Sequence, residues 1–199
     1  MWVVKIGGSL NQDPLLPAWL ELLSQLGGGR VTVVCGGGGF ADEVRRSQSH
    51  WHFDDLAAHN MAVLAMAQSA WLAKGLNPQL QLASTEADLR RVLHAGHTAV
   101  WLPQSWLRDE AGPNTNWHNS SDSIALDLAR QLNAERLVVV KSCFVDPAMR
   151  IPELVDAGVL DSRFAALAAG AGFPIDVIQR SELARVRSLL LGDLRSPAS

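Results

Sequence analysis

The sequence predicts an α/β fold in which a largely parallel sheet is covered by helices on both sides. Short runs rich in β-branched residues alternate with longer segments whose apolar residues recur at helical spacing. The short runs are mostly apolar on both faces, which is typical of strands buried inside a parallel sheet. We therefore expect a three-layer αβα sandwich.

Strands and helices follow one another along nearly the whole chain. Strands are expected at residues 2–6, 31–35, 79–83, 98–102, 137–140 and 175–178. Helices are expected at residues 14–26, 40–49, 54–74, 84–93, 121–132, 161–169 and 181–191. Ser84 begins one helix, and residues 120–122 offer caps for another. Residues 103–119, rich in Asn, Pro, Gly and Trp, form either a binding loop or an edge excursion.

Length and composition bound the class of protein. With 199 residues, 48% of them hydrophobic, we expect a single domain at residues 1–194 and a frayed tail at residues 195–199. The net charge of -3 argues against binding nucleic acid by general phosphate attraction. The N-terminus resembles no signal peptide, and no apolar stretch is long enough to span a membrane. The two cysteines, Cys35 and Cys143, are expected to be reduced in a cytoplasmic protein.

An anion site is predicted where the first strand ends. Lys5 is followed by Gly7, Gly8 and Ser9, and parallel sheets bind ligands at the carboxyl ends of their strands. Glycines let backbone N–H groups approach an anion closely, and the lysine adds a positive charge. The alternative is a plain Gly-Gly turn beside a lysine that reaches solvent.

A second glycine-rich segment follows the second strand. Residues 36–39 are four glycines directly before a helix, and a helix N-terminus with bare amides favours an oxyanion or phosphate. An unliganded flexible loop is the bland alternative. The segment also fits a loose dinucleotide fingerprint, Gly36-x-Gly38-x-x-Ala41, but Asp54 and Asp55 open a helix instead of ending the next strand. An NAD-binding protein is therefore a weaker hypothesis.

Lysine is used sparingly, and its placement is informative. The chain has three lysines, and Lys5 and Lys141 both lie at carboxyl ends of predicted strands. Asp122 opens a helix between them in sequence, where the helix dipole stabilises it and where it could hold both ammonium groups. The alternative for Asp122 is an ordinary acid in a first helical turn. Lys74 is interpreted as a surface residue.

The histidines show no metal-binding pattern. His50, His52, His94 and His97 lack cysteine or carboxylate companions at the spacing of a metal site, and no role is predicted for them or for His118. Trp117 lies beside the predicted site in sequence and could shield a ligand.

Three motifs occur in the order found in a known family. They are residues 3–9 (VVKIGGS), residues 33–38 (VVCGGG) and residues 121–125 (SDSIA). In these motifs the chain resembles the amino acid kinase family, which includes acetylglutamate, aspartate, uridylate and isopentenyl phosphate kinases. Residues 39–45 and 55–66 are most similar to a narrower group, the kinases of 5-(aminomethyl)-3-furanmethanol phosphate in methanofuran biosynthesis. The family fold has about eight strands, two more than the pattern predicts.

The resemblance implies roles for particular residues in an ATP- and Mg²⁺-dependent kinase. Lys5 and Lys141 would contact the transferring phosphoryl group, and Asp122 would orient both lysines. The residues implied in nucleotide binding are Lys5, Gly7, Gly8, Ser9, Lys141 and Ser142, and those implied in acceptor binding are Gly37, Gly38, Gly39, Asp42 and His59. No resident metal site is expected.

The resemblance also bears on the acceptor and on assembly. An acid at Asp42 suits an acceptor that carries an ammonium group, although Asp42 could simply charge the start of its helix. The acceptor expected is the aminomethylfuran phosphate. The alternatives are that the protein is a uridylate or isopentenyl phosphate kinase, or a non-catalytic oxyanion or nucleotide store or sensor of the same fold. Family members commonly form homo-oligomers, for which the helix with Trp71 could serve.

Overall fold

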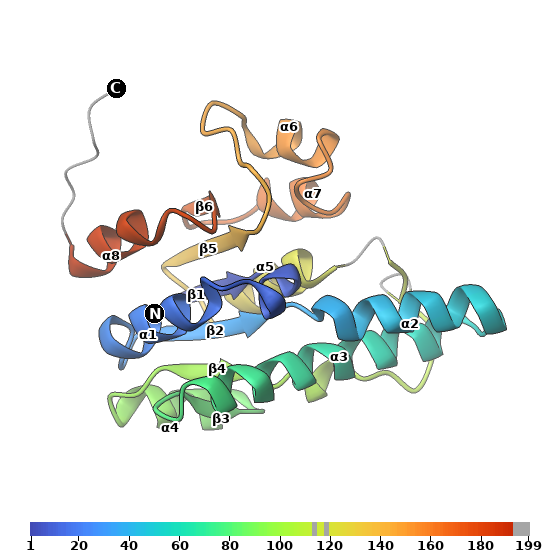
Figure 1. Cartoon of the computed structure of the whole chain (residues 1–199), viewed down its shortest axis with the longest axis horizontal. Helices are drawn as coiled ribbons and strands as arrows, with labels where there is room; N and C mark the ends of the chain where they lie inside the picture. The colour runs from blue at the N-terminus through green and yellow to red at the C-terminus, as the bar shows by residue number, and fades with distance from the viewer. Residues whose placement is uncertain (113–114, 118–119, 193–199) are drawn as a thin grey trace.

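A computed structural model describes residues 1–112, 115–117 and 120–192 (Figure 1). Within them one sheet has six strands, all parallel, in the order β3-β4-β2-β1-β5-β6. The order places β1 between β2 and β5, so the three strands followed by the predicted site residues are neighbours. His118 and residues 195–199 lie outside the described residues.

Each of the six predicted strands is present, and the predicted fold class is confirmed. The described part of the chain has six strands instead of the eight implied by the family resemblance. Their bounds are β1 Trp2–Ile6, β2 Val31–Cys35, β3 Gln81–Ala83, β4 Ala99–Trp101, β5 Arg136–Lys141 and β6 Ile175–Gln179.

The predicted helices are also present, with shifted ends. The α-helices are α1 Leu16–Leu26, α2 Gly38–Trp51, α3 Asp55–Leu76, α4 Glu86–His94, α5 Ser121–Gln131, α6 Ile151–Asp156, α7 Phe164–Ala168 and α8 Leu183–Leu191. Two short 3₁₀ helices, η1 Gly8–Gln12 and η2 Gln104–Trp106, and helix α6 were not predicted.

Hydrogen bonds to side chains mark the starts of helices α3, α4 and α7. The expected helix start at Ser84 is wrong, because the N-cap of α4 is Thr85, whose hydroxyl accepts from the Asp88 amide at 3.1 Å. Helix α7 begins at Phe164 and not at Asp161. The Asp161 carboxylate accepts from the Arg163 and Phe164 amides, which places Asp161 in the turn before the helix. Helix α3 is capped by Asp54, which accepts from the Ala57 amide at 2.8 Å.

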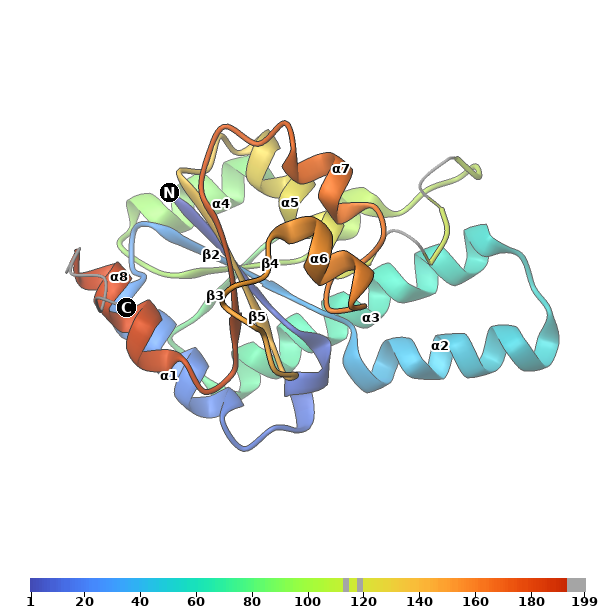
Figure 2. The same ribbon diagram turned by 90° about the horizontal axis from the view of Figure 1, so that it is seen from above.

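The sheet separates two hydrophobic layers, because successive strand residues point to opposite faces. On one face, Val4 and Val138 pack with α1, α8 and the C-terminal half of α3. On the other, Val3 and Val139 pack with α4, α5 and α7. Helices α2 and α3 run side by side and project beyond the sheet in both views (Figures 1 and 2).

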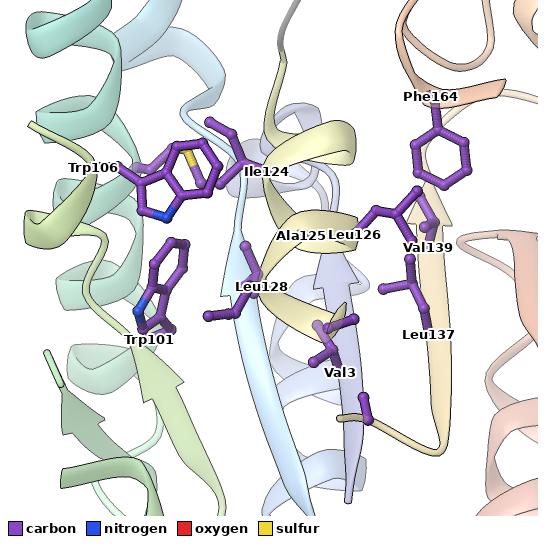
Figure 3. Packing of buried hydrophobic residues seen from close by; sticks show 14 of the residues in the cluster. Val3, Trp101, Trp106, Ile124, Ala125, Leu126, Leu128, Leu137, Val139 and Phe164 are labelled. Carbon is purple, nitrogen blue, oxygen red and sulfur yellow. The ribbon is translucent and has the colours of Figure 1, made fainter. Parts of the chain in front are cut away.

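Helix α5 is the centre of the second layer. Ile124, Ala125, Leu126 and Leu128 are buried on the face that carries Val3 and Val139, as Figure 3 shows. This packing fixes α5 along the sheet with its first turn near the carboxyl ends of β1 and β5. None of the helices in the described residues is sufficiently long and apolar to cross a membrane.

Candidate active site

The pleat of the sheet directs Lys5 and Lys141 toward the same layer. Lys5 is two residues after Val3 in β1, and Lys141 is two residues after Val139 in β5, so both share the face on which α5 packs. The parallel register pairs Lys5 with Val139, which places Lys141 farther along toward the strand ends. The Lys5 side chain is 3% exposed and that of Lys141 is 17% exposed.

Asp122 joins the two lysines. Lys5 Nζ lies 2.6 Å from Asp122 Oδ1, and Lys141 Nζ lies 2.7 Å from Asp122 Oδ2, so one carboxylate holds both ammonium groups. Asp122 is in the first turn of α5, where the helix dipole favours a negative charge. The contact of Asp122 with both lysine ammonium groups, which the sequence predicted as one alternative, is present.

Burial and the neighbouring charges act in opposite directions on the groups of this cluster. Burial lowers the pKa of Lys5 below its ordinary value, and the nearby Asp122 carboxylate only partly offsets that effect. Burial alone would raise the pKa of Asp122, but the ammonium groups of Lys5 and Lys141 outweigh it and hold the pKa below its usual value. With both lysines protonated, the three groups carry one net positive charge, which suits an anionic ligand.

The two glycine loops lie directly against each other. A Cβ on Gly8 would fall 2.1 Å from the Gly38 amide nitrogen, and one on Gly36 would fall 2.5 Å from the Gly8 nitrogen. Gly38 also has a positive φ of 54°, which disfavours any other residue. The backbones of the loops after β1 and β2 come so close together that these positions require glycine, whether or not the loops bind a ligand.

A pocket of about 300 Å³ opens above the lysines. Lys5, Lys141 and Asp122 form one end, and the wall between α2, α3 and α5 is largely apolar. The predicted site residues that line it are Lys5, Gly8, Ser9, Gly37, Gly38, Asp42, His59, Asp122 and Lys141.

Three predicted residues lie outside this pocket. Gly7 donates its amide to the Val140 carbonyl at 2.9 Å and so extends the pairing of β1 with β5. The Ser142 hydroxyl lies 2.6 Å from that of Ser9, at the pocket edge. Gly39 lines a neighbouring hollow between η1 and α2, which shares Gly8, Ser9 and Asp42 with the pocket.

His59 has a structural contact as well as a place in the pocket wall. Its Nε2 lies 3.0 Å from the Trp106 carbonyl oxygen, and the side chain is buried. The neighbouring Asn60 exchanges two hydrogen bonds with the Arg108 backbone. Helix α3 therefore holds the segment after β4 in place.

The outer end of the pocket is polar, and of its residues only Asp42 and Trp117 were predicted from sequence. Asp42 pairs with Arg45 at 2.7 Å, and the Arg45 guanidinium lies 4.4 Å from the Trp117 ring centroid. Gln48 accepts from Trp117 Nε1 at 2.7 Å and donates to Asp55 at 2.9 Å. Spacing of three residues on α2 places Asp42, Arg45 and Gln48 on one helix face, which is the signal that could have revealed them. Trp117 supports the binding-loop interpretation of the 103–119 segment.

Four further histidines and both cysteines of the described residues lie outside this site. His50, His52, His94 and His97 are exposed, and the described residues contain no group of three potential metal ligands among His, Cys, Asp and Glu. Both cysteines are free, as expected. Burial raises the pKa of the Cys35 thiol to about 12.

Comparison with known proteins now identifies the family. Residues 1–143 match the model of the amino acid kinase family. The chain belongs to that family. The fold agrees, since the uridylate kinase of Archaeoglobus fulgidus superposes with a TM-score of 0.70 at 16% identity, covering 96% of this chain and 95% of that one. The UMP kinase of Bacillus anthracis gives a TM-score of 0.67 at 18% identity, over 96% and 91% of the two chains.

The chain is also similar in sequence to a protein that is named as a kinase. The [5-(aminomethyl)furan-3-yl]methyl phosphate kinase of Methanocaldococcus jannaschii is 27% identical over 141 residues. The matched segment covers 70% of this chain. It covers 64% of the relative, so the chain spans slightly less than two thirds of the relative's length.

Proposed function

We propose that the protein is an ATP-dependent kinase that transfers the γ-phosphoryl group to a small phosphate monoester, giving a diphosphate. The observation that carries this proposal is the buried Lys5–Asp122–Lys141 cluster at the end of a pocket lined by two glycine loops. Membership in the amino acid kinase family supports it.

The chemistry of phosphoryl transfer suits this cluster. The reaction passes through a loose transition state, so catalysis depends on positioning and on neutralising charge more than on covalent help. Lys5 and Lys141 would neutralise the transferring group, and Asp122 would orient both ammonium groups. An acceptor that is already a phosphate monoester needs no strong general base.

Each glycine loop would bind one of the two phosphate-bearing ligands. Gly7, Gly8 and Ser9, with Ser142 hydrogen-bonded to Ser9, would lie beneath the ATP phosphates. The acceptor phosphate would contact the loop after β2. The residues proposed there are Gly37 and Gly38, with Gly39 beside them.

Magnesium enters this proposal together with ATP. The described site residues nearest the transferring group are two lysines and the carboxylate that they occupy, a donor set that fits a polyphosphate and not a free divalent cation. Mg²⁺ held by the nucleotide phosphates would supply further neutralisation of charge.

The acceptor proposed is an aminomethylfuran phosphate of the kind named in the Methanocaldococcus jannaschii relative. With the acceptor phosphate at the lysines, its far end would reach the polar outer end of the pocket, where Asp42 and Asp55 offer carboxylates. Arg45 neutralises much of the Asp42 charge at 2.7 Å, whereas Asp55 accepts from the neutral amide of Gln48. We therefore add Asp55 to Asp42 as a partner for an ammonium group.

The decisive experiment measures ADP formation from ATP with a panel of phosphate monoesters. The panel holds the aminomethylfuran phosphate, its hydroxymethyl analogue without the amine, UMP and isopentenyl phosphate. We expect turnover with the amine and a much higher KM for the analogue. Asp42→Asn and Asp55→Asn should raise the KM for the amine far more than the KM for ATP. Turnover with UMP alone would reject the acceptor, and tight oxyanion binding without any turnover would reject the enzyme.

The lysines provide a matched set of variants. Lys141→Ala should lower kcat by orders of magnitude, because a group that neutralises transition-state charge is lost. Lys74→Ala is the control, since Lys74 Nζ donates to the Pro78 and Leu80 carbonyls at the end of α3, away from the pocket. Near-normal kcat in Lys141→Ala would show that Lys141 does not contact the transferring phosphoryl group.

Homo-oligomer formation, expected from the family resemblance, stays a prediction. The exposed face of α3 carries Met61, Leu64 and Trp71, with Trp71 61% exposed, which supports that prediction. Light scattering on the full chain measures it directly.

A further inference from the structure

The Asp161 carboxylate accepts several hydrogen bonds from the first turn of α5, and the sequence did not predict them. Asp161 lies in the connection between β5 and β6, just before α7. Its carboxylate accepts from the Ser120 hydroxyl at 2.7 Å and amide at 3.2 Å, and from the Ser123 hydroxyl at 2.5 Å and amide at 3.1 Å. These donors lie 38 and 41 residues away in sequence.

The same carboxylate is anchored on its own side. Asp161 Oδ1 accepts from the Arg163 amide at 3.1 Å and from the Phe164 amide at 3.0 Å. Phe164 is fully buried in the layer that holds α5, so the turn that carries Asp161 is fixed to the core. A carboxylate has about four lone-pair sites, so these donors saturate it.

The donors on α5 lie on both sides of Asp122. Ser120 is the N-cap of α5, and its hydroxyl accepts from the Asp122 amide at 3.2 Å while it donates to Asp161. Ser123 follows Asp122 directly. The Asp122 carboxylate is occupied by Lys5 and Lys141, so it does not cap its own helix. Asp161 supplies that anchoring charge at the helix N-terminus, where the dipole favours it.

We propose that Asp161 is a positioning residue for phosphoryl transfer, which holds the first turn of α5 so that the Asp122 carboxylate meets both lysines. The inference rests on the proposed kinase function. Displacement of a catalytic constellation by about 1 Å can cost ~100-fold in rate. The negative charge of Asp161 also raises the pKa of Lys5 slightly against the larger effect of burial.

The test compares Asp161→Ala and Asp161→Asn with Thr85→Ala. Thr85 caps α4 on the same side of the sheet but away from the pocket, so its loss removes a cap of similar kind without touching the site. Single-turnover rates, both KM values and hydrogen exchange at the amides of residues 121–124 are measured at a temperature where each variant is folded.

We expect kcat to fall by about 10- to 100-fold in Asp161→Ala, with little change in the KM for ATP. Asp161→Asn, which keeps one carbonyl acceptor, should be intermediate. Amide exchange at residues 121–124 should accelerate. Thr85→Ala should show none of these effects.

Either of two results would overturn the inference. They are a normal kcat in folded Asp161→Ala and unchanged exchange at residues 121–124. Where Asp161→Ala fails to fold, Asp161→Asn decides. Wild-type protein that turns over no acceptor would reject the kinase function separately, and the exchange measurement would still show whether Asp161 holds the turn of α5.

Discussion

Replacing Asp122 by asparagine removes one charge from the buried cluster and keeps nearly the same side-chain volume. The ion pairs at 2.6 Å and 2.7 Å each correspond to about 6 kcal/mol at an effective dielectric constant of ~20. Desolvation of the three groups and repulsion between Lys5 and Lys141 offset most of that attraction. Removing the carboxylate leaves the desolvation and the repulsion in place.

The expected loss is therefore set by the uncompensated lysines. Removing one partner of a buried pair typically costs about 3–5 kcal/mol of unfolding free energy. For a domain of this length, that corresponds to a fall of roughly 6–20 °C in Tm. Activity should be lost as well, because the ammonium groups are no longer oriented.

The pH dependence gives the sharper test. Burial lowers the pKa of Lys5, and without Asp122 nothing at the site counters that effect as strongly. Above the lowered pKa of Lys5 and below about pH 10, the unfolded chain then binds more protons at Lys5 than the folded variant, so the unfolding free energy of the variant rises with pH. Lys5 loses its proton at a higher pH in the wild type, where Asp122 raises its pKa, so the variant's deficit in unfolding free energy should narrow toward pH 10.

Urea denaturation from pH 7 to pH 10 measures this directly. Asp42→Asn is the matched control, since it makes the same change in the same pocket within an ion pair whose side chains are 51% and 60% exposed. It should cost no more than about 1 kcal/mol at any pH. Equal losses in both variants, or an Asp122→Asn deficit that stays constant with pH, would refute the reasoning.

Two further outcomes follow from the loops and the thiols. Gly8→Ala should destabilise the protein strongly, because its Cβ would meet the Gly38 nitrogen at 2.1 Å, whereas Gly39→Ala, with its nearest atom 3.7 Å away, should unfold like wild type; similar denaturation midpoints would contradict the packing of the loops. Cys143 should react with a maleimide in the native protein, whereas Cys35, buried with its pKa raised to about 12, should react only on unfolding. Mass spectrometry locates the label, and native labelling of Cys35 would contradict its burial.

Local pattern was sufficient for the strands and for the candidate lysines. Apolar β-branched runs predicted all six strands of the described chain, because burial on both faces is written into consecutive residues. The short helix α6, which has Pro152 in its first turn, carries too few residues for a periodic signal and was missed. The role of Asp161 was missed for another reason, since from sequence it is an ordinary acid in the first turn of a predicted helix.

The sequence alone therefore establishes the α/β class, the glycine loops and the lysines at the strand ends, because each depends on residues that are close together along the chain. Tertiary structure decides that Asp122 bridges Lys5 and Lys141, that burial lowers the Lys5 pKa, and that Asp161 anchors α5. Those properties arise between segments tens of residues apart. Desolvation and hydrogen-bond partners depend on what packs across the sheet, which no local periodicity records.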